Sequence, residues 1–115
     1  MYKNNKHILS KYWQTWKLIQ PNLTYYQNSV LIGMVLSDAL LIKTNKYPYV
    51  KFEQGYAQRE FIDILFNIFK THCFQEQLYV RYKNNKVHSF IFKTFSHPTF
   101  EFVYNLLYEN NKKVI

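Results

Sequence analysis

One acidic side chain, Asp38, has a setting that suggests chemistry. It is the one acid among residues 1–52, which also contain seven lysines, and it ends the apolar run that begins at Val30. A helix that is apolar on nearly every side is normally buried. A buried carboxylate is costly unless a metal ion or a lysine pairs with it, and the negative end of the helix adds to that cost. The alternative is a carboxylate at an exposed helix end, solvated by water.

Gly33 and Ser37 precede this acid and lie four residues apart, so they share one side of the predicted helix. Two small residues at this spacing allow a second helix to approach closely. If that second helix is another copy, two Asp38 carboxylates meet at one end. Paired carboxylates beside a polyanion can hold the divalent metals that cleave phosphodiester bonds. The alternative is a close helix contact within the domain itself.

Composition favours a polyanionic partner. The 115 residues suffice for one domain, and 15 Lys and Arg against 7 Asp and Glu give a formal charge of +8. Nucleic acid is the first candidate and an acidic membrane surface the second. The single Cys73 and four scattered histidines exclude an internal disulfide and a zinc motif. The longest apolar run is too short for a membrane span. Residues with A/T-rich codons dominate, which suggests an organellar genome and a protein made without a transit peptide.

Helices and strands are predicted in an order that can position Asp38. Asn28 and Ser29 are suitable caps for its helix, Ser96 and Pro98 mark the start of the last helix, and Asn84-Asn85 suggests a two-residue hairpin turn. The order predicts an α+β domain with a four-stranded, largely antiparallel sheet. The predicted helices cover residues 8–19, 30–41, 58–71 and 98–108, and the strands cover 40–44, 47–54, 77–83 and 86–93.

Residues 31–39, Leu-Ile-Gly-Met-Val-Leu-Ser-Asp-Ala, resemble the motif of LAGLIDADG homing endonucleases and related intron maturases. Further segments are similar, in the same order, to those that follow the motif in family members, the later ones to the organellar branch: residues 50–54, 59–65, 92–100, 104–108 and 112–115. The resemblance implies a LAGLIDADG-type αββαββα half-domain with a sheet that saddles DNA. It assigns residues 24–115 to this domain and leaves 1–23 as an extension with a short extra helix. Ala39 differs from the usual glycine, which would be strained if the position needs positive φ.

The resemblance also implies roles for individual residues. Asp38 would bind Mg²⁺ and act in catalysis, with the carbonyl of Ser37 beside the metal. Lys93 would be the basic residue of the active site, and Gln54 would order solvent near the metals. The helix interface would comprise Gly33, Ser37, Val30 and Met34. Candidates for DNA contact, with solvated surface side chains as the alternative, are Lys43, Lys51, Arg81, Lys83 and His88.

The implied function is cleavage of double-stranded DNA at an intron insertion site by an intron-encoded, mitochondrial or otherwise organellar enzyme. Since the sequence carries one motif, activity would require a homodimer or a separate second half. Two alternatives remain at this stage: a non-catalytic maturase that binds intron RNA, and an inactive, truncated relic of a two-motif enzyme. A role at the membrane is disfavoured, because the basic residues are dispersed.

Overall fold

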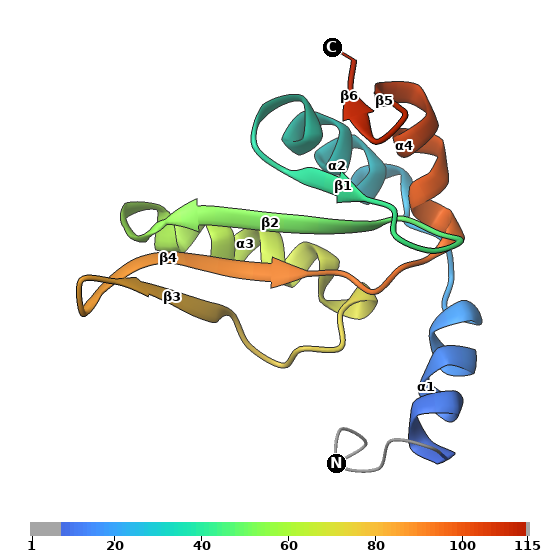
Figure 1. Cartoon of the computed structure of the whole chain (residues 1–115), viewed down its shortest axis with the longest axis horizontal. Coiled ribbons are helices and arrows are strands. Elements are labelled where there is room, and N and C mark those ends of the chain that lie inside the picture. The colour runs from blue at the N-terminus through green and yellow to red at the C-terminus, as the bar shows by residue number, and fades with distance from the viewer. Residues whose placement is uncertain (1–7, 115) are drawn as a thin grey trace.

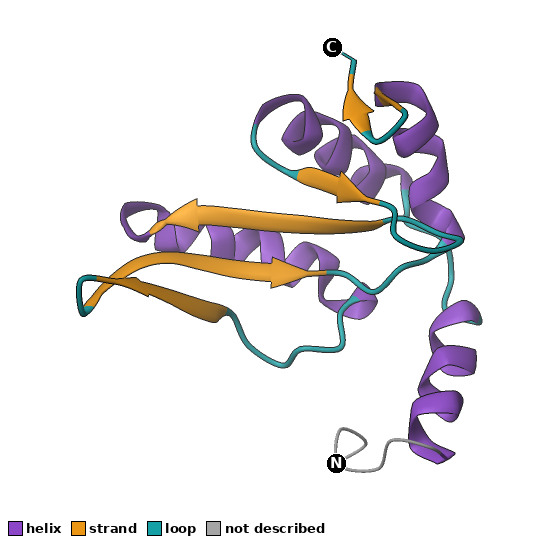
Figure 2. Cartoon of the chain, in the orientation of Figure 1, coloured by secondary structure: helices purple, strands orange, loops and turns teal. Residues whose placement is uncertain are grey.

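A four-stranded antiparallel sheet forms the centre of the computed structural model, which describes residues 8–114. The strands lie in the order β1-β2-β4-β3 (Figure 1; Figure 2). The α+β class and the four-stranded sheet are as predicted. Residues 1–7 and 115, which belong to the predicted 1–23 extension and 24–115 domain, lie outside the described part. The strand bounds are β1 Leu40–Ile42, β2 Tyr49–Gly55, β3 Tyr79–Lys83 and β4 Lys86–Lys93.

Helices cover one side of this sheet and its β1 edge. In Figure 1, α3 runs behind β2 and β4, while α2 and α4 lie above the sheet. A second, two-stranded sheet of β5 and β6 follows α4. No helix within residues 8–114 is long and apolar enough to cross a bilayer. The remaining bounds are α1 Ile8–Leu18, α2 Tyr25–Ser37, α3 Arg59–Phe69, α4 Glu101–Leu107, β5 Tyr108–Glu109 and β6 Lys112–Lys113.

Stacked phenylalanine rings hold α3 against the sheet. The ring of Phe52 on β2 lies 4.5 Å from that of Phe92 on β4 and 5.1 Å from that of Phe69 on α3. All three side chains are fully buried. Loss of one such ring typically costs about 3–5 kcal/mol. Because side chains alternate along a strand, burying this face leaves the other face of the sheet open.

The α2 helix begins five residues earlier than predicted. Its N-cap is Thr24, whose hydroxyl accepts from the Gln27 backbone N–H, while the Gln27 side chain accepts from the Thr24 N–H. Asn28 and Ser29, the predicted caps, therefore lie inside the helix. This reciprocal capping box satisfies the backbone N–H groups of Thr24 and Gln27, which would otherwise have no partner at the start of the helix. The helix ends at Ser37, with Asp38 as its C-cap.

Two Asn-Asn turns make the hairpins. Asn84 and Asn85 have φ of 53° and 63°, and Asn110 and Asn111 have the same values. Positive φ at both central residues is the geometry of a tight two-residue hairpin, and asparagine tolerates it well. The first hairpin joins β3 to β4 as predicted. The second joins β5 to β6 and was not predicted, because its strands are only two residues long.

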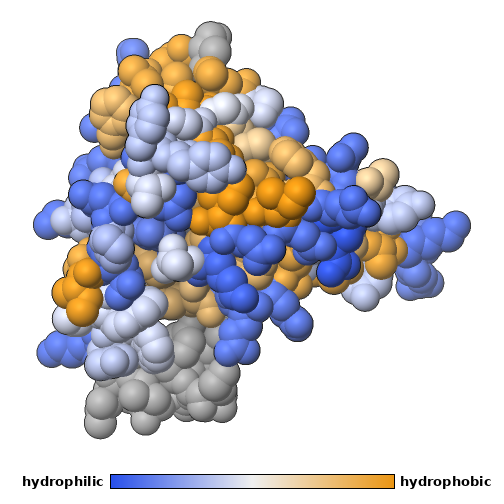
Figure 3. Space-filling model, turned by 180° about the vertical axis from the view of Figure 1, so that it is seen from behind, coloured by the Kyte–Doolittle hydropathy of each residue, from blue (hydrophilic) through white to orange (hydrophobic). Residues whose placement is uncertain are grey.

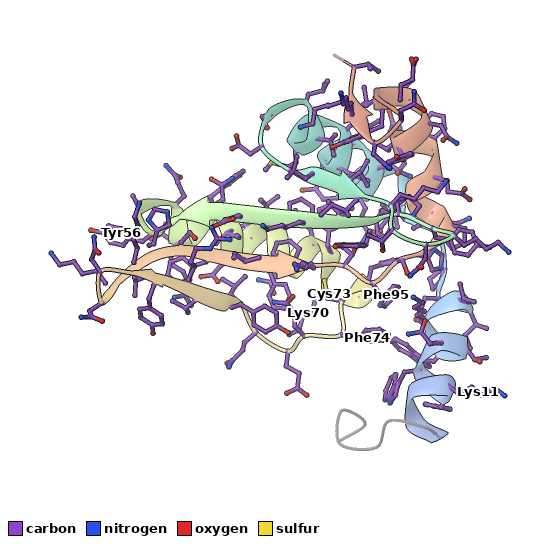
Figure 4. The ribbon with its side chains drawn as sticks, viewed as in Figure 1. Lys11, Tyr56, Lys70, Cys73, Phe74 and Phe95 are labelled. Atoms are coloured by element: carbon purple, nitrogen blue, oxygen red, sulfur yellow. The ribbon has the colours of Figure 1, made fainter. Side chains whose placement is uncertain are left out.

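Aromatic rings attach α1 to the rest of the chain. The ring of Trp16 lies 6.1 Å from that of Phe74 and 6.0 Å from that of Phe95, and Trp13 also meets Phe74. Phe74 and Phe95 come from the segments that follow α3 and β4, on the side that faces α1 (Figure 4). The Lys17 ammonium also donates to the Ser96 hydroxyl, 2.6 Å away. The predicted helix over residues 8–19 is thus present and packed on the domain.

Two buried histidines hold the connection between α1 and α2. His72 Nε2 donates to the carbonyl of Pro21 at 2.9 Å, and His97 Nε2 donates to that of Gln20 at 3.0 Å. His97 Nδ1 accepts from the Thr99 N–H, so this histidine, and not the predicted Ser96, caps the turn that leads into α4. Burial lowers the pKa of both imidazoles, and the two carbonyl contacts offset this only in part. Both rings are therefore held neutral in the folded chain.

Stability should fall as the pH drops below about 6.5, the ordinary histidine pKa. The folded pKa of His72 and of His97 is lowered, so the unfolded chain binds protons that the folded chain does not. The free energy of unfolding should thus decrease with falling pH, by up to about 1.4 kcal/mol per pH unit for each histidine. Urea unfolding between pH 7.5 and 5 measures this slope. The variant His97→Gln should flatten it, whereas His88→Gln, at an exposed site, should not; equal slopes in both would contradict the assignment.

Candidate functional site

Asp38 lies at an exposed corner between α2 and β1. The Asp38 N–H and the Ala39 N–H both donate to the carbonyl of Met34, at 2.8 Å each, and this closes the helix. β1 then begins at Leu40, which pairs with Lys51 of β2. The carboxylate is exposed, so of the two predicted settings the structure has the solvated helix end. It stands where the partial negative charge of α2 is concentrated, a place that favours cations.

Gln54 reaches this carboxylate from the end of β2. Its Nε2 donates to Asp38 Oδ2 at 3.2 Å, across 16 positions of sequence. The amide thereby restricts the rotation of the carboxylate. The structure thus brings these two predicted residues together.

Lys113 contacts the residue that follows Asp38 and was not predicted from the sequence. Its Nζ donates to the carbonyl of Ala39, 3.1 Å away and 74 positions earlier in the chain. It lies on β6, and the Val114 N–H holds that strand to the Leu107 carbonyl. Beside it, the Leu41 N–H of β1 donates to the hydroxyl oxygen of Tyr108 on β5, at 3.0 Å. The C-terminal hairpin thus places a cation one residue from Asp38.

Lys93, the predicted basic residue, lies farther from the corner. It ends β4 opposite Lys51, which in turn is opposite Leu40. Two strand spacings, about 10 Å, therefore separate the backbones of Lys93 and Leu40. The exposed Lys93 side chain shares the open sheet face with Lys51, and its backbone N–H is fixed by the side chain of Gln75 at 2.9 Å. This position suits contact with a ligand that lies across the sheet.

The oxygen atoms at the corner suit a hard divalent cation. The Ser37 hydroxyl turns back to the carbonyls of Gly33 and Met34, at 3.2 and 3.1 Å, so the backbone carbonyl is the oxygen that Ser37 can offer. Carboxylate and carbonyl oxygens are the ligands that Mg²⁺ and Ca²⁺ prefer. Within residues 8–114, no three His, Cys, Asp or Glu side chains gather into a metal-binding group. A cation bound beside Asp38 would therefore need ligands other than a cluster of such side chains in this part of the chain.

Ala39 is not strained by replacing glycine. Among residues 8–114, positive φ occurs only at the four turn asparagines, so position 39 does not need it. The alanine side chain is fully buried and belongs to the core. The departure from the family pattern therefore carries no backbone cost in this chain.

One face of α2 is bare. Ser29, Gly33 and Ser37, spaced by four, are exposed along it, and Leu36 is 50% exposed beside them. A Cβ added to Gly33 would meet no atom within 4 Å. Hydrophobic residues gather over α2 and α4 on the back of the molecule (Figure 3). We call Ser29, Gly33, Leu36 and Ser37 the bare face of α2.

The predicted interface residues Val30 and Met34 do not lie on this face. Met34 is buried in the core, and Val30 is partly buried against it. Each residue of a helix turns by about 100°, so the residue directly after Gly33 points toward the sheet when Gly33 points away. Gly33 and Ser37 are exposed as the predicted helix pairing would require, whereas Met34 is buried and Val30 is only partly exposed.

Two of the predicted DNA contacts on the open sheet face, Lys51 and Arg81, both lie next to Glu53. Lys51 Nζ lies 3.6 Å from Glu53 Oε1, and an Arg81 guanidinium nitrogen lies 3.4 Å from Glu53 Oε2. The Ser89 hydroxyl donates to the same Oε2 at 2.5 Å. Burial alone would raise the pKa of Glu53, but the Ser89 hydrogen bond and the charges of Arg81 and Lys51 together lower it. Glu53 was not predicted as a site residue.

The other three candidates are dispersed. Lys43 follows β1, and its Nζ lies 5.4 Å from the centre of the Tyr104 ring of α4. Lys83 is exposed at the end of β3, beside the Asn84-Asn85 turn. His88 is exposed on β4 at the point where the pairing with β3 shifts register. Lys83 and His88 could thus meet a ligand at the tip of the β3–β4 hairpin, and Lys43 at the other edge of the sheet.

Comparison with known proteins identifies this arrangement. The sequence profile described as the LAGLIDADG DNA endonuclease family matches residues 28–115. The chain belongs to the LAGLIDADG family. Among solved structures it is similar to the homing endonuclease I-WcaI bound to its DNA recognition sequence, with a TM-score of 0.73 and 27% sequence identity. A search of curated proteins gave no significant match.

This LAGLIDADG chain carries a single motif half. The match covers 96% of the chain, α1 included, but only 49% of the I-WcaI chain. The chain therefore spans about half the length of that enzyme. Its motif corresponds to α2 and the Asp38 corner.

The variant Gly33→Ala should stabilise the isolated chain and weaken pairing through α2. A methyl group at position 33 meets open space in one chain, and alanine favours a helix over glycine by about 1 kcal/mol. Between two closely packed helices, the same methyl would push the backbones apart. Unfolding at high dilution and sedimentation at higher concentration measure the two effects. Gly55→Ala, where a Cβ also has room, is the control that should leave the solution mass unchanged.

Proposed function

We propose that this chain is one half of a metal-dependent homing-type endonuclease that cleaves double-stranded DNA. The observation that carries the proposal is the exposed Asp38 at the end of a helix with a bare face, where Gln54 bonds its carboxylate and Lys113 bonds the carbonyl of the next residue, Ala39. The family match supports a nuclease, and the DNA in the I-WcaI structure supports double-stranded DNA as the ligand.

A second half, either another copy or a separate LAGLIDADG half, would pack on the bare face of α2. An exposed Leu36 beside a row of small residues is unfavourable in water and favourable between helices. Since Asp38 directly follows this helix, pairing would bring two carboxylates together. The partner would thus complete a metal site for which one half supplies too few acidic ligands.

The open face of the sheet would hold the DNA. Lys51, Arg81 and Lys93 lie on this face, and Lys83 and Lys86 lie at the hairpin tip. Lysine and arginine contacts with phosphate provide most of the affinity for DNA and weaken as the salt concentration rises. The backbone crossing β1 would then lie beside Asp38.

The residues at the corner would have different chemical roles. Asp38 and the Ser37 carbonyl would hold a divalent cation, which when bound supplies an activated water and neutralises charge on the phosphate. Gln54 fixes the orientation of the carboxylate through its 3.2 Å hydrogen bond. The Lys113 ammonium, held beside Ala39, would stabilise the negative charge that develops on the phosphate oxygens during hydrolysis.

The variant Asp38→Asn should lose cleavage but keep DNA binding. Removing the negative charge weakens the metal site, so we expect the cleavage rate to fall by about a hundredfold or more. The full-length chain is first used to select a binding sequence from a random duplex library. Binding and Mg²⁺-dependent nicking of that sequence are then measured. Asp63→Asn, the same change at an exposed acid on α3, is the control; loss of binding in Asp38→Asn would instead indicate a structural role.

Lys113→Met and Lys93→Met should separate the two candidate basic residues. Because Lys113 lies at the corner, its variant should reduce the cleavage rate of bound DNA while affinity changes little. Lys93 lies on the open face, so its variant should mainly weaken binding and reduce the dependence of affinity on salt. Single-turnover cleavage at saturating protein measures the first effect, and titrations at several salt concentrations measure the second. If Lys93→Met slowed cleavage and Lys113→Met mainly weakened binding, Lys93 would be the basic residue of the active site, as predicted from the sequence.

A further inference from the structure

Glu53 is the one acid among the residues of strands β1 to β4, and it stands on the open face of the sheet. Its neighbours on that face include Lys51, Arg81 and Lys93. On a surface that binds phosphates, a carboxylate lowers the affinity for DNA, because it repels the backbone. An acid at this place therefore contributes little to affinity, and a role in recognition explains it better.

The surroundings of Glu53 fix its orientation. Oε2 accepts from the Ser89 hydroxyl and lies 3.4 Å from the Arg81 guanidinium, while Oε1 lies 3.6 Å from the Lys51 ammonium. Gly55, Ser89 and Arg81 form one row across the strands, so two small residues leave room for the arginine to lean toward Glu53. The result is a carboxylate and a guanidinium held side by side, with about a quarter and a half of their side-chain surfaces exposed.

The contacts to Glu53 leave capacity for a ligand. The closest approach joins one guanidinium nitrogen of Arg81 to Glu53, and the guanidinium carries five N–H donors in total. Oε1 of Glu53 faces Lys51 at more than hydrogen-bond distance, so it can accept from another donor. In the major groove, a carboxylate accepts from the amino group of cytosine, and arginine donates to O6 and N7 of guanine. The cytosine amino group and the guanine O6 and N7 lie next to each other on the major-groove edge of one G·C pair.

We propose that Glu53 and Arg81 act together to read a single G·C base pair in the half of the DNA site that this chain covers. Glu53 accepts from the cytosine amino group, and Arg81 donates to the guanine. Ser89 and Lys51 are positioning residues that hold the carboxylate. This assignment rests on the proposed function, because it requires DNA on the open face of the sheet.

The experiment compares the sequences that the full-length chain and its variants select from a randomised duplex library. For the wild-type chain we expect a motif that contains the G·C pair. In Glu53→Gln, the amide matches adenine rather than cytosine, so the preference at that one position should fall roughly 10- to 100-fold or change to A·T. Arg81→Lys keeps the charge but loses the two parallel donors, and it should relax the same position. Glu76→Gln, an equal charge change at an exposed acid outside the strands, should select the wild-type motif.

Three results would overturn the assignment. An unchanged motif in Glu53→Gln would exclude Glu53 as a reader of bases. An equal loss of preference at every position would show a general structural role. If the wild-type chain selects no motif at all, sequence-specific DNA binding fails, and the proposed function fails with it. Circular dichroism verifies that each variant is folded. If Glu53→Gln does not fold, the motif selected by Arg81→Lys tests the assignment instead.

Discussion

The rest of the structure depends on a helix that this chain buries on one side only. The face of α2 that includes Leu31, Met34 and Val35 belongs to the core, while the face with Gly33 and Leu36 remains in solvent. The core contacts fix where the helix ends, so they also fix where Asp38 stands. An apolar face left in water raises the free energy of the single chain. The same helix thus positions the acid with one face and leaves an apolar side chain, Leu36, exposed on the other.

The two faces of the sheet also differ, one being buried against α3 and the other open. Phenylalanines on the inner face anchor α3 and make the sheet rigid, so the side chains of the outer face keep fixed relative positions. Alternation along the strands places Lys51 and Glu53 on one side and Phe52 on the other. A rigid, charged surface next to the Asp38 corner is what a ligand with regularly spaced negative charges requires. The aromatic contacts of α1 and the two buried histidines extend this rigidity to the edge of the domain.

Much of this could be predicted from sequence, for local reasons. The apolar run ending in Asp38, the strand alternation and the Asn84-Asn85 turn are patterns over a few residues, and they predicted the correct order of helices and strands up to α4. The start of α2 was wrong because the Thr24 capping box outweighs the apolar pattern at Val30. Met34, predicted in the helix interface, is buried in the core of this chain, because an apolar run does not show which face of a helix is buried.

Lys113 was missed because its role depends on a contact between distant parts of the chain. Asn110-Asn111 before two lysines repeats the turn signal of Asn84-Asn85, so the second hairpin could have been found. Its position against Ala39 could not, since no local pattern encodes a contact across 74 residues. Glu53 was overlooked for a similar reason, because its partners lie on three different strands.

The docking of the C-terminal hairpin has a consequence for the order of events during synthesis. Closing a loop of this length costs entropy, and the contact can form only after the last strand has left the ribosome. Asp38 and its corner are made early, but the lysine arrives at nearly the last residue described. A growing or interrupted chain therefore carries the acid without its cation. The complete constellation exists only in a chain that has been translated beyond Lys113 and has folded the β5–β6 hairpin against β1.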